Sequence, residues 1–283
     1  MPTLAVVAAA GLGASSGLYI KGLAFSSLAM SSLRMTIPFL LALPTVAKHG
    51  LLLGRRGMRM RLFVTSALNA GRLYLFIQAF KLTSIGNAVV LLYLWPVFAL
   101  LMDSLRKREK PGWQKIGVLA LATTGVVALN SGQGFSISGN DLLGSACMIL
   151  SALVYGGTAI VFKDALSVMT ETDTLYFQNA IGGMAFLPFL IAEIPHVPLA
   201  QLGIGIAYGA AVGFVGFGLF FVGMKRLPLF KFSALSYSEV PLGLLVGILF
   251  QGEVMTPWKW LGIALVIAGS FFAQTLRLGD TSS

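Results

Sequence analysis

Long apolar runs separated by short polar clusters dominate this sequence. Hydrophobic residues make up 57% of the chain and charged residues only 11%, whereas soluble domains average about 25% charged residues. Apolar runs of about 18 residues or more are long enough to cross the bilayer core as a helix. Because lipid offers no partner to backbone groups, each span must satisfy its own hydrogen bonds. The sequence therefore predicts an all-α integral membrane protein.

We expect ten transmembrane helices joined mostly by very short loops, with no room for a soluble domain. The first apolar run lacks a basic leading segment, so we interpret it as a membrane helix and not as a cleaved leader. The Gly/Ser-rich stretch 131–140 separates two halves, taken as 1–135 and 136–283. The predicted spans are roughly 3–21, 27–47, 61–81, 84–104, 113–130, 141–163, 174–192, 199–224, 228–250 and 257–276.

Lysine and arginine residues are distributed unevenly among the expected loops. With a cytoplasmic N-terminus, the inner side holds 15 of the 20 basic residues and the outer side holds three, Lys21, Lys81 and Lys259. Cytoplasmic loops typically carry such an excess. We therefore expect both termini to be cytoplasmic, and we expect the basic clusters at 55–61 and 106–110 to contact anionic lipid headgroups. The net charge of +10 is thus explained by topology, without nucleic acid.

The chain also repeats itself at an offset of 145 residues. Each copy has a proline within one span, then a tryptophan that opens the next span, then a glycine. An odd number of five helices per half places the second copy upside down in the membrane. Inverted repeats of this kind are typical of secondary transporters that rock about a central site. The matching residues are Leu82, Pro96, Trp113 and Gly117 in the first copy, and Leu227, Pro241, Trp258 and Gly262 in the second.

The second copy of this pattern resembles a known family. The stretches Lys225–Pro228 and Ala234–Pro241, then Gly252-Glu253 and Trp260–Gly262, are similar to the closing signature of the drug/metabolite transporter superfamily, EamA-like branch. The sequence departs from that pattern by one residue between Glu239 and Pro241, and by the lack of a tryptophan in the first span. The resemblance implies a carrier in a bacterial inner membrane. It would export a small metabolite, such as an amino acid, by alternating access, using the substrate gradient or protons.

Arg72 is the strongest candidate for a contact with the substrate. It lies halfway along its span, and Ser66, Asn69, Arg72 and Phe76 recur at three- and four-residue steps, so they share one helix face. A polar face on a membrane helix is expected to point into the protein. Two interpretations stay open: Arg72 binds an anionic group of the substrate through paired hydrogen bonds, or it forms a structural ion pair with Glu239.

Two further charged residues lie within predicted spans. Glu239 is either a proton carrier that couples transport to a gradient or a structural group. Arg34 is about seven residues from the outer end of its span, so its long side chain is able to reach the headgroups. The resemblance favours a shared structural role for Arg34, with substrate contact as the alternative.

Aromatic and proline residues complete the predicted site. Tyr93, Trp95, Tyr155 and Tyr237 are candidates to line a cavity formed chiefly by the first, third, fourth, sixth, eighth and ninth spans. Aromatic residues also gather at membrane interfaces without any binding role. Pro96 and Pro241 lie within spans, where they act as hinges or as static bends. The same alternatives, cavity or interface, apply to Tyr19, Gln178, Asn179 and Tyr208.

Other classes of function find little support. The chain has one cysteine, Cys147, and two distant histidines, His49 and His196, so we expect no disulfide, metal site or cofactor. No phosphate-binding loop is present. A membrane-embedded enzyme acting on a lipid or small metabolite is the alternative to a carrier, but it would need catalytic groups that the sequence does not supply. A channel is the third hypothesis.

Overall fold

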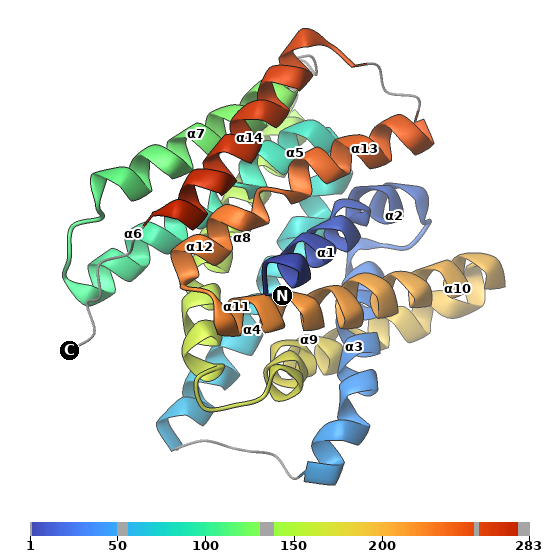
Figure 1. Cartoon of the computed structure of the whole chain (residues 1–283). Helices are drawn as coiled ribbons and strands as arrows, with labels where there is room; N and C mark the ends of the chain where they lie inside the picture. The colour runs from blue at the N-terminus through green and yellow to red at the C-terminus, as the bar shows by residue number, and fades with distance from the viewer. Residues whose placement is uncertain (1, 50–55, 131–138, 252–254, 277–283) are drawn as a thin grey trace.

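The computed structural model describes residues 2–49, 56–130, 139–251 and 255–276, and every regular element in these ranges is helical (Figure 1). The elements are α1 (Pro2–Ala14), α2 (Ser16–Gly22), α3 (Ser27–His49), α4 (Arg56–Leu82), α5 (Ile85–Leu92), α6 (Trp95–Lys107), α7 (Trp113–Asn130), α8 (Gly139–Ala165), α9 (Glu171–Glu193), the 3₁₀ turn η1 (Ile194–His196), α10 (Leu199–Tyr208), the π-helical η2 (Gly209–Gly216), α11 (Phe217–Arg226), α12 (Leu229–Ser236), α13 (Glu239–Gln251) and α14 (Pro257–Thr275). The boundary predicted at 135–136 and the pair Gly252-Glu253 lie outside the described residues.

Each predicted span coincides, within about five residues at either end, with one helix or with consecutive helical pieces. Among the described residues, six helical stretches are long and apolar enough to cross a membrane. They run over Pro2–Gly22, Ser27–Lys48, Ile85–Lys107, Gly139–Ala165, Glu171–His196 and Leu199–Arg226. The other four predicted spans are helical as well, and their crossing of the membrane stays a prediction.

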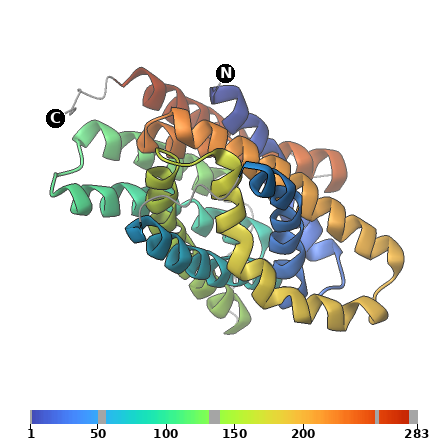
Figure 2. The same cartoon turned by 90° about the horizontal axis from the view of Figure 1, so that it is seen from below.

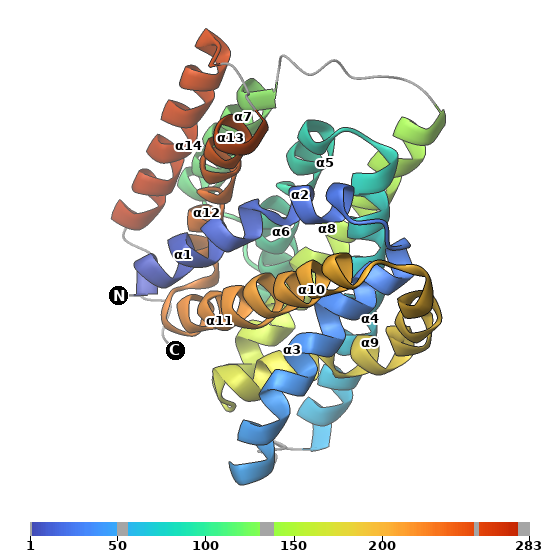
Figure 3. The ribbon, with the colours of Figure 1, turned by 90° about the vertical axis from the view of Figure 1, so that its right-hand side faces the viewer.

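Three of the expected continuous helices are broken instead. α1 passes into α2 at Ser15, whose hydroxyl donates to the carbonyl of Leu12 at 2.7 Å. α5 ends before Tyr93 and α6 begins at Trp95; likewise α12 ends at Ser236 and α13 begins at Glu239. By contrast, α10, η2 and α11 run on without interruption (Figure 3). The sequence did not predict these breaks, because the chain stays apolar between α5 and α6, and the short polar runs at 15–16 and 236–239 also fit within a continuous span.

The helices pack as antiparallel neighbours drawn from both halves of the chain. α3 lies along α9 (Figure 2), α4 lies along α8, and α7 lies along α14 (Figure 3). Glycine permits the close approach of α7 and α14: a Cβ at Gly125 of α7 would lie 2.9 Å from the carbonyl oxygen of Gly262 of α14. The stripe of Gly205, Gly209 and Gly213 similarly receives α3, because small residues at four-residue spacing let another helix approach closely.

The connections meet in two groups at opposite ends of the bundle. At one end, Lys21 donates to the carbonyl of Thr83 at 3.1 Å, and the carboxylate of Glu193 accepts from the amide of Ser26 at 2.9 Å. At the other end, Lys163 donates to the carbonyl of Leu227 at 2.8 Å, and Lys225 pairs with Glu171 at 3.1 Å. Every second loop therefore lies at the same end of the bundle, as expected when successive spans run in opposite directions.

Candidate functional site

A central cavity lies among the broken helices, and the space between its walls, counted together with the part that is open to the surroundings, is about 750 Å³. Its walls come from the six spans expected to form it and from α3 in addition. The elements of those six spans are α1, α2, α4, α5, α6, α8, α10, η2, α11, α12 and α13. A second space of about 730 Å³ adjoins it. Gly13, Phe76, Tyr93 and Glu239 belong to the walls of both, so the two spaces meet at these residues.

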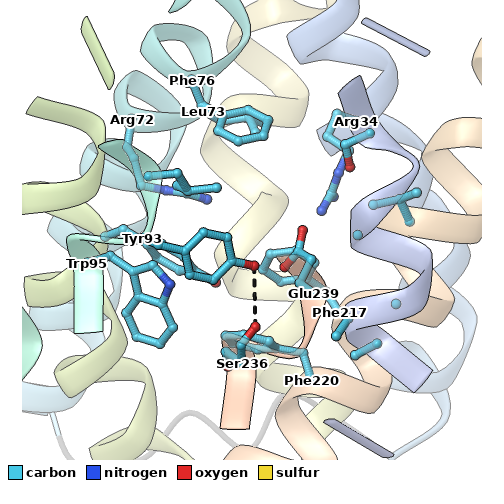
Figure 4. Close-up of a pocket in the computed structure, with 18 of the residues that line it drawn as sticks. Arg34, Arg72, Leu73, Phe76, Tyr93, Trp95, Phe217, Phe220, Ser236 and Glu239 are labelled. Carbon is cyan, nitrogen blue, oxygen red and sulfur yellow. Dashed lines mark hydrogen bonds between the residues drawn. The ribbon is translucent and has the colours of Figure 1, made fainter. Parts of the chain in front are cut away.

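Arg72 enters the cavity from α4 (Figure 4). Its side chain is 5% exposed, and its Nε donates to Oδ1 of Asn69 at 3.1 Å. The guanidinium carbon lies 4.2 Å from the centre of the Tyr155 ring, and the hydroxyl of Ser151 donates to the Arg72 carbonyl at 3.0 Å. Asn69 in turn donates to the carbonyl of Gln178 at 3.2 Å. These contacts fix the guanidinium face on an aromatic ring and leave its outer N–H edge toward the cavity.

The predicted alternative, a structural ion pair between Arg72 and Glu239, does not form in this structure. No carboxylate of the described residues lies within 4 Å of the Arg72 guanidinium. The two groups reach the cavity from different helices and are separated by aromatic side chains (Figure 4). The aromatic stacking at Tyr155 and the hydrogen bond to Asn69 take the place of the carboxylate.

Arg34 also faces the cavity, which corrects the expectation that it reaches the headgroups. Its side chain is 5% exposed, and the guanidinium lies 4.5 Å from the centre of the Phe217 ring. A Cβ at Gly213 would come within 3.0 Å of Nη1, so this glycine leaves the space through which the side chain passes. Arg34 lies across the cavity from Arg72 (Figure 4).

Glu239 is the first residue of α13 and not a mid-helix residue, because the helix breaks just before it. Its carboxylate thus lies at a helix N-terminus, where unpaired N–H groups and the helix dipole favour negative charge. The carboxylate packs against the backbone of α1, and a Cβ at Gly13 would lie 2.7 Å from Oε1. The Tyr93 hydroxyl is its neighbour on the other side.

Tyr93 and Tyr237 tie the two helix breaks together. The Tyr93 hydroxyl donates to the carbonyl of Ser236 at 3.3 Å (Figure 4), and the Tyr237 hydroxyl donates to the carbonyl of Tyr93 at 2.9 Å. The hydroxyl of Thr123 lies 2.9 Å from the Tyr237 oxygen. Carbonyls at helix ends lack a partner within the helix, so each tyrosine satisfies one such carbonyl in the opposite half of the chain.

Pro96 and Pro241 follow these breaks and do not kink a continuous helix. Pro96 is the second residue of α6 and Pro241 is the third residue of α13. In a first helical turn the missing proline N–H would have had no helical acceptor, so proline fits there without a lost hydrogen bond. A hinge role for either residue stays a prediction.

The structure brings most of the predicted site residues to one place. Arg72, Phe76, Tyr93, Trp95, Tyr155 and Glu239 line the cavity. Asn69 and Tyr237 lie behind that wall and contact it through hydrogen bonds. Their functional roles stay predictions, because position alone does not establish transport.

Sequence reasoning left other lining residues out of the site. Arg34 was set aside in favour of a structural role, although a charge within an apolar run was itself the signal for a cavity position. Phe217 and Phe220 stack at 5.0 Å in the wall opposite Trp95, and Ser16 lines the cavity at the break after α1. Nothing in the pattern distinguishes those two phenylalanines from ordinary core residues.

Known proteins share both the sequence pattern and the fold. The pattern of the EamA-like transporter family matches residues 2–131 and 142–275. A crystal structure of 18% sequence identity superposes with a TM-score of 0.76 over 96% of both chains, which shows a common fold. The structural match therefore supports the fold separately from the family match in sequence.

Three curated relatives illustrate the range of the family. A protein of Streptantibioticus cattleyicolor named a probable terminal-alkyne amino-acid exporter is 28% identical over 69% of this chain and 65% of its own, a little under two thirds of its length. The threonine/homoserine exporter RhtA of Escherichia coli is 26% identical over 71% and 66%. A riboflavin transporter of Rhizobium johnstonii is 25% identical over 88% and 82%.

The family match covers nearly the whole chain and both of its halves. It agrees with an all-helical fold that has several membrane-length apolar helices and a cavity into which charged side chains project. The protein therefore belongs to the EamA-like transporter family.

Proposed function

We propose that this protein is a secondary transporter that exports a small amino-acid-like metabolite by alternating access. The observation that carries this proposal is the presence of buried guanidinium groups and a carboxylate around one cavity. Arg72 offers its N–H edge to a substrate carboxylate, and Glu239 offers an acceptor for a substrate ammonium group. Two of the relatives are named as amino-acid exporters, which supports this class of substrate.

The proposed architecture is ten membrane helices in two inverted five-helix repeats, 1–135 and 136–283. Helices that would correspond under the repeat pack on each other: α3 on α9, and α7 on α14. The broken helices α5–α6 and α12–α13 correspond as well, and their breaks are joined by the reciprocal tyrosine bonds. Contacts between equivalent elements are what a two-fold axis through the centre would produce.

We further place both termini in the cytoplasm, in a bacterial inner membrane. The end of the bundle that contains Lys163, Lys225 and Arg106 would then face the cytoplasm, and the end that contains Lys21 would face outward. This assignment follows the excess of basic residues on one side. Anionic lipid headgroups would contact the cytoplasmic basic clusters.

In this mechanism the cavity opens to one side at a time. The cavity charges lie near the middle of the bundle, where only a ligand or the protein itself can neutralise them. The adjoining space runs from Glu239 past Phe80 and Ile85, which lie near the outward end in the proposed topology. The bonded tyrosine pair lies at the breaks on which the two halves would pivot.

The test of this proposal is counterflow by purified protein in liposomes. Vesicles loaded with an unlabelled mixture of amino acids should take up labelled threonine or another labelled member saturably, and the unlabelled form should compete. Vesicles without protein supply the background. Absence of exchange for every amino acid and organic acid tested, with folded and inserted protein, would refute the proposal.

Two energy sources are compatible with Glu239, the substrate gradient alone and a proton gradient. Glu239→Gln separates them, because glutamine keeps the shape of the side chain but cannot carry a proton. If Glu239 carries the proton, the variant should lose acceleration by an imposed pH gradient, measured as the ratio of its own exchange rates with and without the gradient, so that weaker substrate binding cancels. Equal acceleration of the wild type and the variant would refute coupling through Glu239.

A further inference from the structure

The cavity holds more positive charge than its own residues neutralise. Two guanidinium groups, Arg34 and Arg72, line it together with one carboxylate, Glu239. Charges in the interior of a membrane protein are costly unless they are paired or face water or a ligand. With Glu239 ionised the cavity carries one excess positive charge, and with Glu239 protonated it carries two.

Neither arginine finds a carboxylate partner within the described part of the chain. Each ion pair found there joins other residues, near the end of the bundle that contains Arg106 and Lys225. Phe217 covers one face of the Arg34 guanidinium and Tyr155 covers one face of the Arg72 guanidinium, and neither ring adds negative charge. Planar guanidinium groups stacked in this way keep their N–H edges for bidentate binding of carboxylate or a similar anion.

The two arginines approach the cavity from opposite walls, and Glu239 lies between them and below (Figure 4). A third polar group points to a ligand at this place. The Tyr208 hydroxyl is fully buried in the cavity wall and has no hydrogen-bond partner of normal geometry in the described residues, with Arg34 and Ser16 as its polar neighbours. A carboxylate at Arg34 would supply the acceptor that this hydroxyl lacks.

We propose that the preferred substrate carries two acidic groups and one amino group, as an amino-dicarboxylic acid does. One carboxylate binds at Arg34 and Tyr208, the other binds at Arg72, and the ammonium group lies toward Glu239. This inference rests on the proposed transport function and specifies its substrate class. A monocarboxylic amino acid would leave one guanidinium without an anion.

The charge balance gives this preference a role in transport. An amino-dicarboxylate has a net charge of minus one, so it brings the cavity with ionised Glu239 to neutrality. A neutral amino acid leaves the loaded cavity as positive as the empty one. The occluded state, which is closed to water on both sides, is therefore most favourable with the dicarboxylate bound.

Isosteric pairs of amino acids test the charge directly. Aspartate and asparagine have nearly the same shape, as do glutamate and glutamine, so each pair differs by one carboxylate. The binding signal is the fluorescence of Trp95, which is 2% exposed and lies in the cavity wall 4.7 Å from Tyr155, centre to centre. The other three tryptophans are exposed and are replaced by phenylalanine to isolate this signal; they are Trp113, Trp258 and Trp260.

We expect aspartate or glutamate to bind and exchange at a concentration about tenfold or more below that of its amide, the effect of one charge-assisted contact. Equal or better binding and exchange of the amides would overturn the inference and leave the proposed transport function standing. Failure of all four compounds, together with every other amino acid, to exchange would reject the transport function and this inference with it.

Single substitutions locate the preference in the cavity. Arg34→Gln and Arg72→Gln each leave one guanidinium for two carboxylates, so the preference for aspartate over asparagine should fall to about threefold or less. Arg61→Gln is the matched control, because Arg61 lies exposed on the same helix as Arg72. Unchanged preference in both folded cavity variants would overturn the assignment. If they do not fold, the comparison of isosteric pairs in the unsubstituted cavity decides it alone.

Discussion

The contact between Gly13 and Glu239 yields a prediction that can be worked out in detail. A Cβ at Gly13 would lie 2.7 Å from Oε1, 2.9 Å from Cδ and 3.2 Å from Oε2 of Glu239. An ordinary contact needs about 3.4 Å, so Gly13→Ala must push the carboxylate away by roughly 0.7 Å. The carboxylate is the end of a flexible side chain, so it can move without displacing the helices.

The expected result is a functional defect with little loss of stability. A charge-assisted contact contributes about 1.5–3 kcal/mol, and losing half of it should weaken substrate binding by roughly three- to tenfold. Alanine is favoured over glycine within a helix by up to about 1 kcal/mol, which offsets part of the crowding. The midpoint of thermal unfolding should therefore shift by only a few degrees.

Counterflow kinetics and Trp95 fluorescence measure this effect. Gly11→Ala is the matched control on the same helix, because the nearest atom to a Cβ there is Leu242 Cδ1 at 3.9 Å. Its substrate affinity should equal that of the wild type. Equal affinity of Gly13→Ala and Gly11→Ala in folded protein would refute the idea that the position of the Glu239 carboxylate matters for binding.

Three further substitutions test other parts of the structure. Arg72→Lys should reduce exchange at low substrate concentration about tenfold or more in counterflow, because lysine lacks the planar fork and the ring stacking; wild-type exchange would contradict this. Tyr237→Phe should lower the free energy of unfolding by about 1 kcal/mol, measured by denaturant titration in detergent, because it removes the hydrogen bond across the breaks; an unchanged value would show that this bond contributes nothing. Gly125→Leu should lower the thermal midpoint strongly, because its Cβ would lie 2.9 Å from the backbone of α14, whereas Gly117→Leu, with no atom within 4 Å, should not; equal midpoints would contradict this.

The sequence predicted the helices well because membrane helices are set by length and apolar composition alone. It failed at the break within α5–α6, where the chain stays apolar, and at the break within α12–α13, where the short polar run 236–239 is also compatible with a continuous span. Tertiary contacts stabilise those breaks: the hydroxyls that satisfy the freed carbonyls belong to Tyr93 and Tyr237, residues 144 positions apart. No local pattern reveals such a pairing.

The candidate site was only partly predictable for a related physical reason. Charge in an apolar span identified Arg72 and Glu239, because few positions in a membrane protein tolerate it. The same rule applied equally to Arg34. Because a long side chain is also able to reach the headgroups, the sequence did not show that Arg34 points into the cavity. The space for the Arg34 side chain depends on Gly213, which lies far away in the sequence on a helix packed against α3.

The close pairing of α7 with α14 has a consequence for biosynthesis. α7 ends at residue 130 and α14 begins at residue 257, so a ribosome must add a further 127 residues before the partner helix starts to emerge. At about 5–20 residues per second, the glycine face of α7 waits for roughly 6–25 s. During that time it presents small residues that suit any closely approaching helix, including α7 of a second nascent chain. In a chain that terminates before α14 this face of α7 stays uncovered. Packing of the first half is therefore complete only after the last helix has been made.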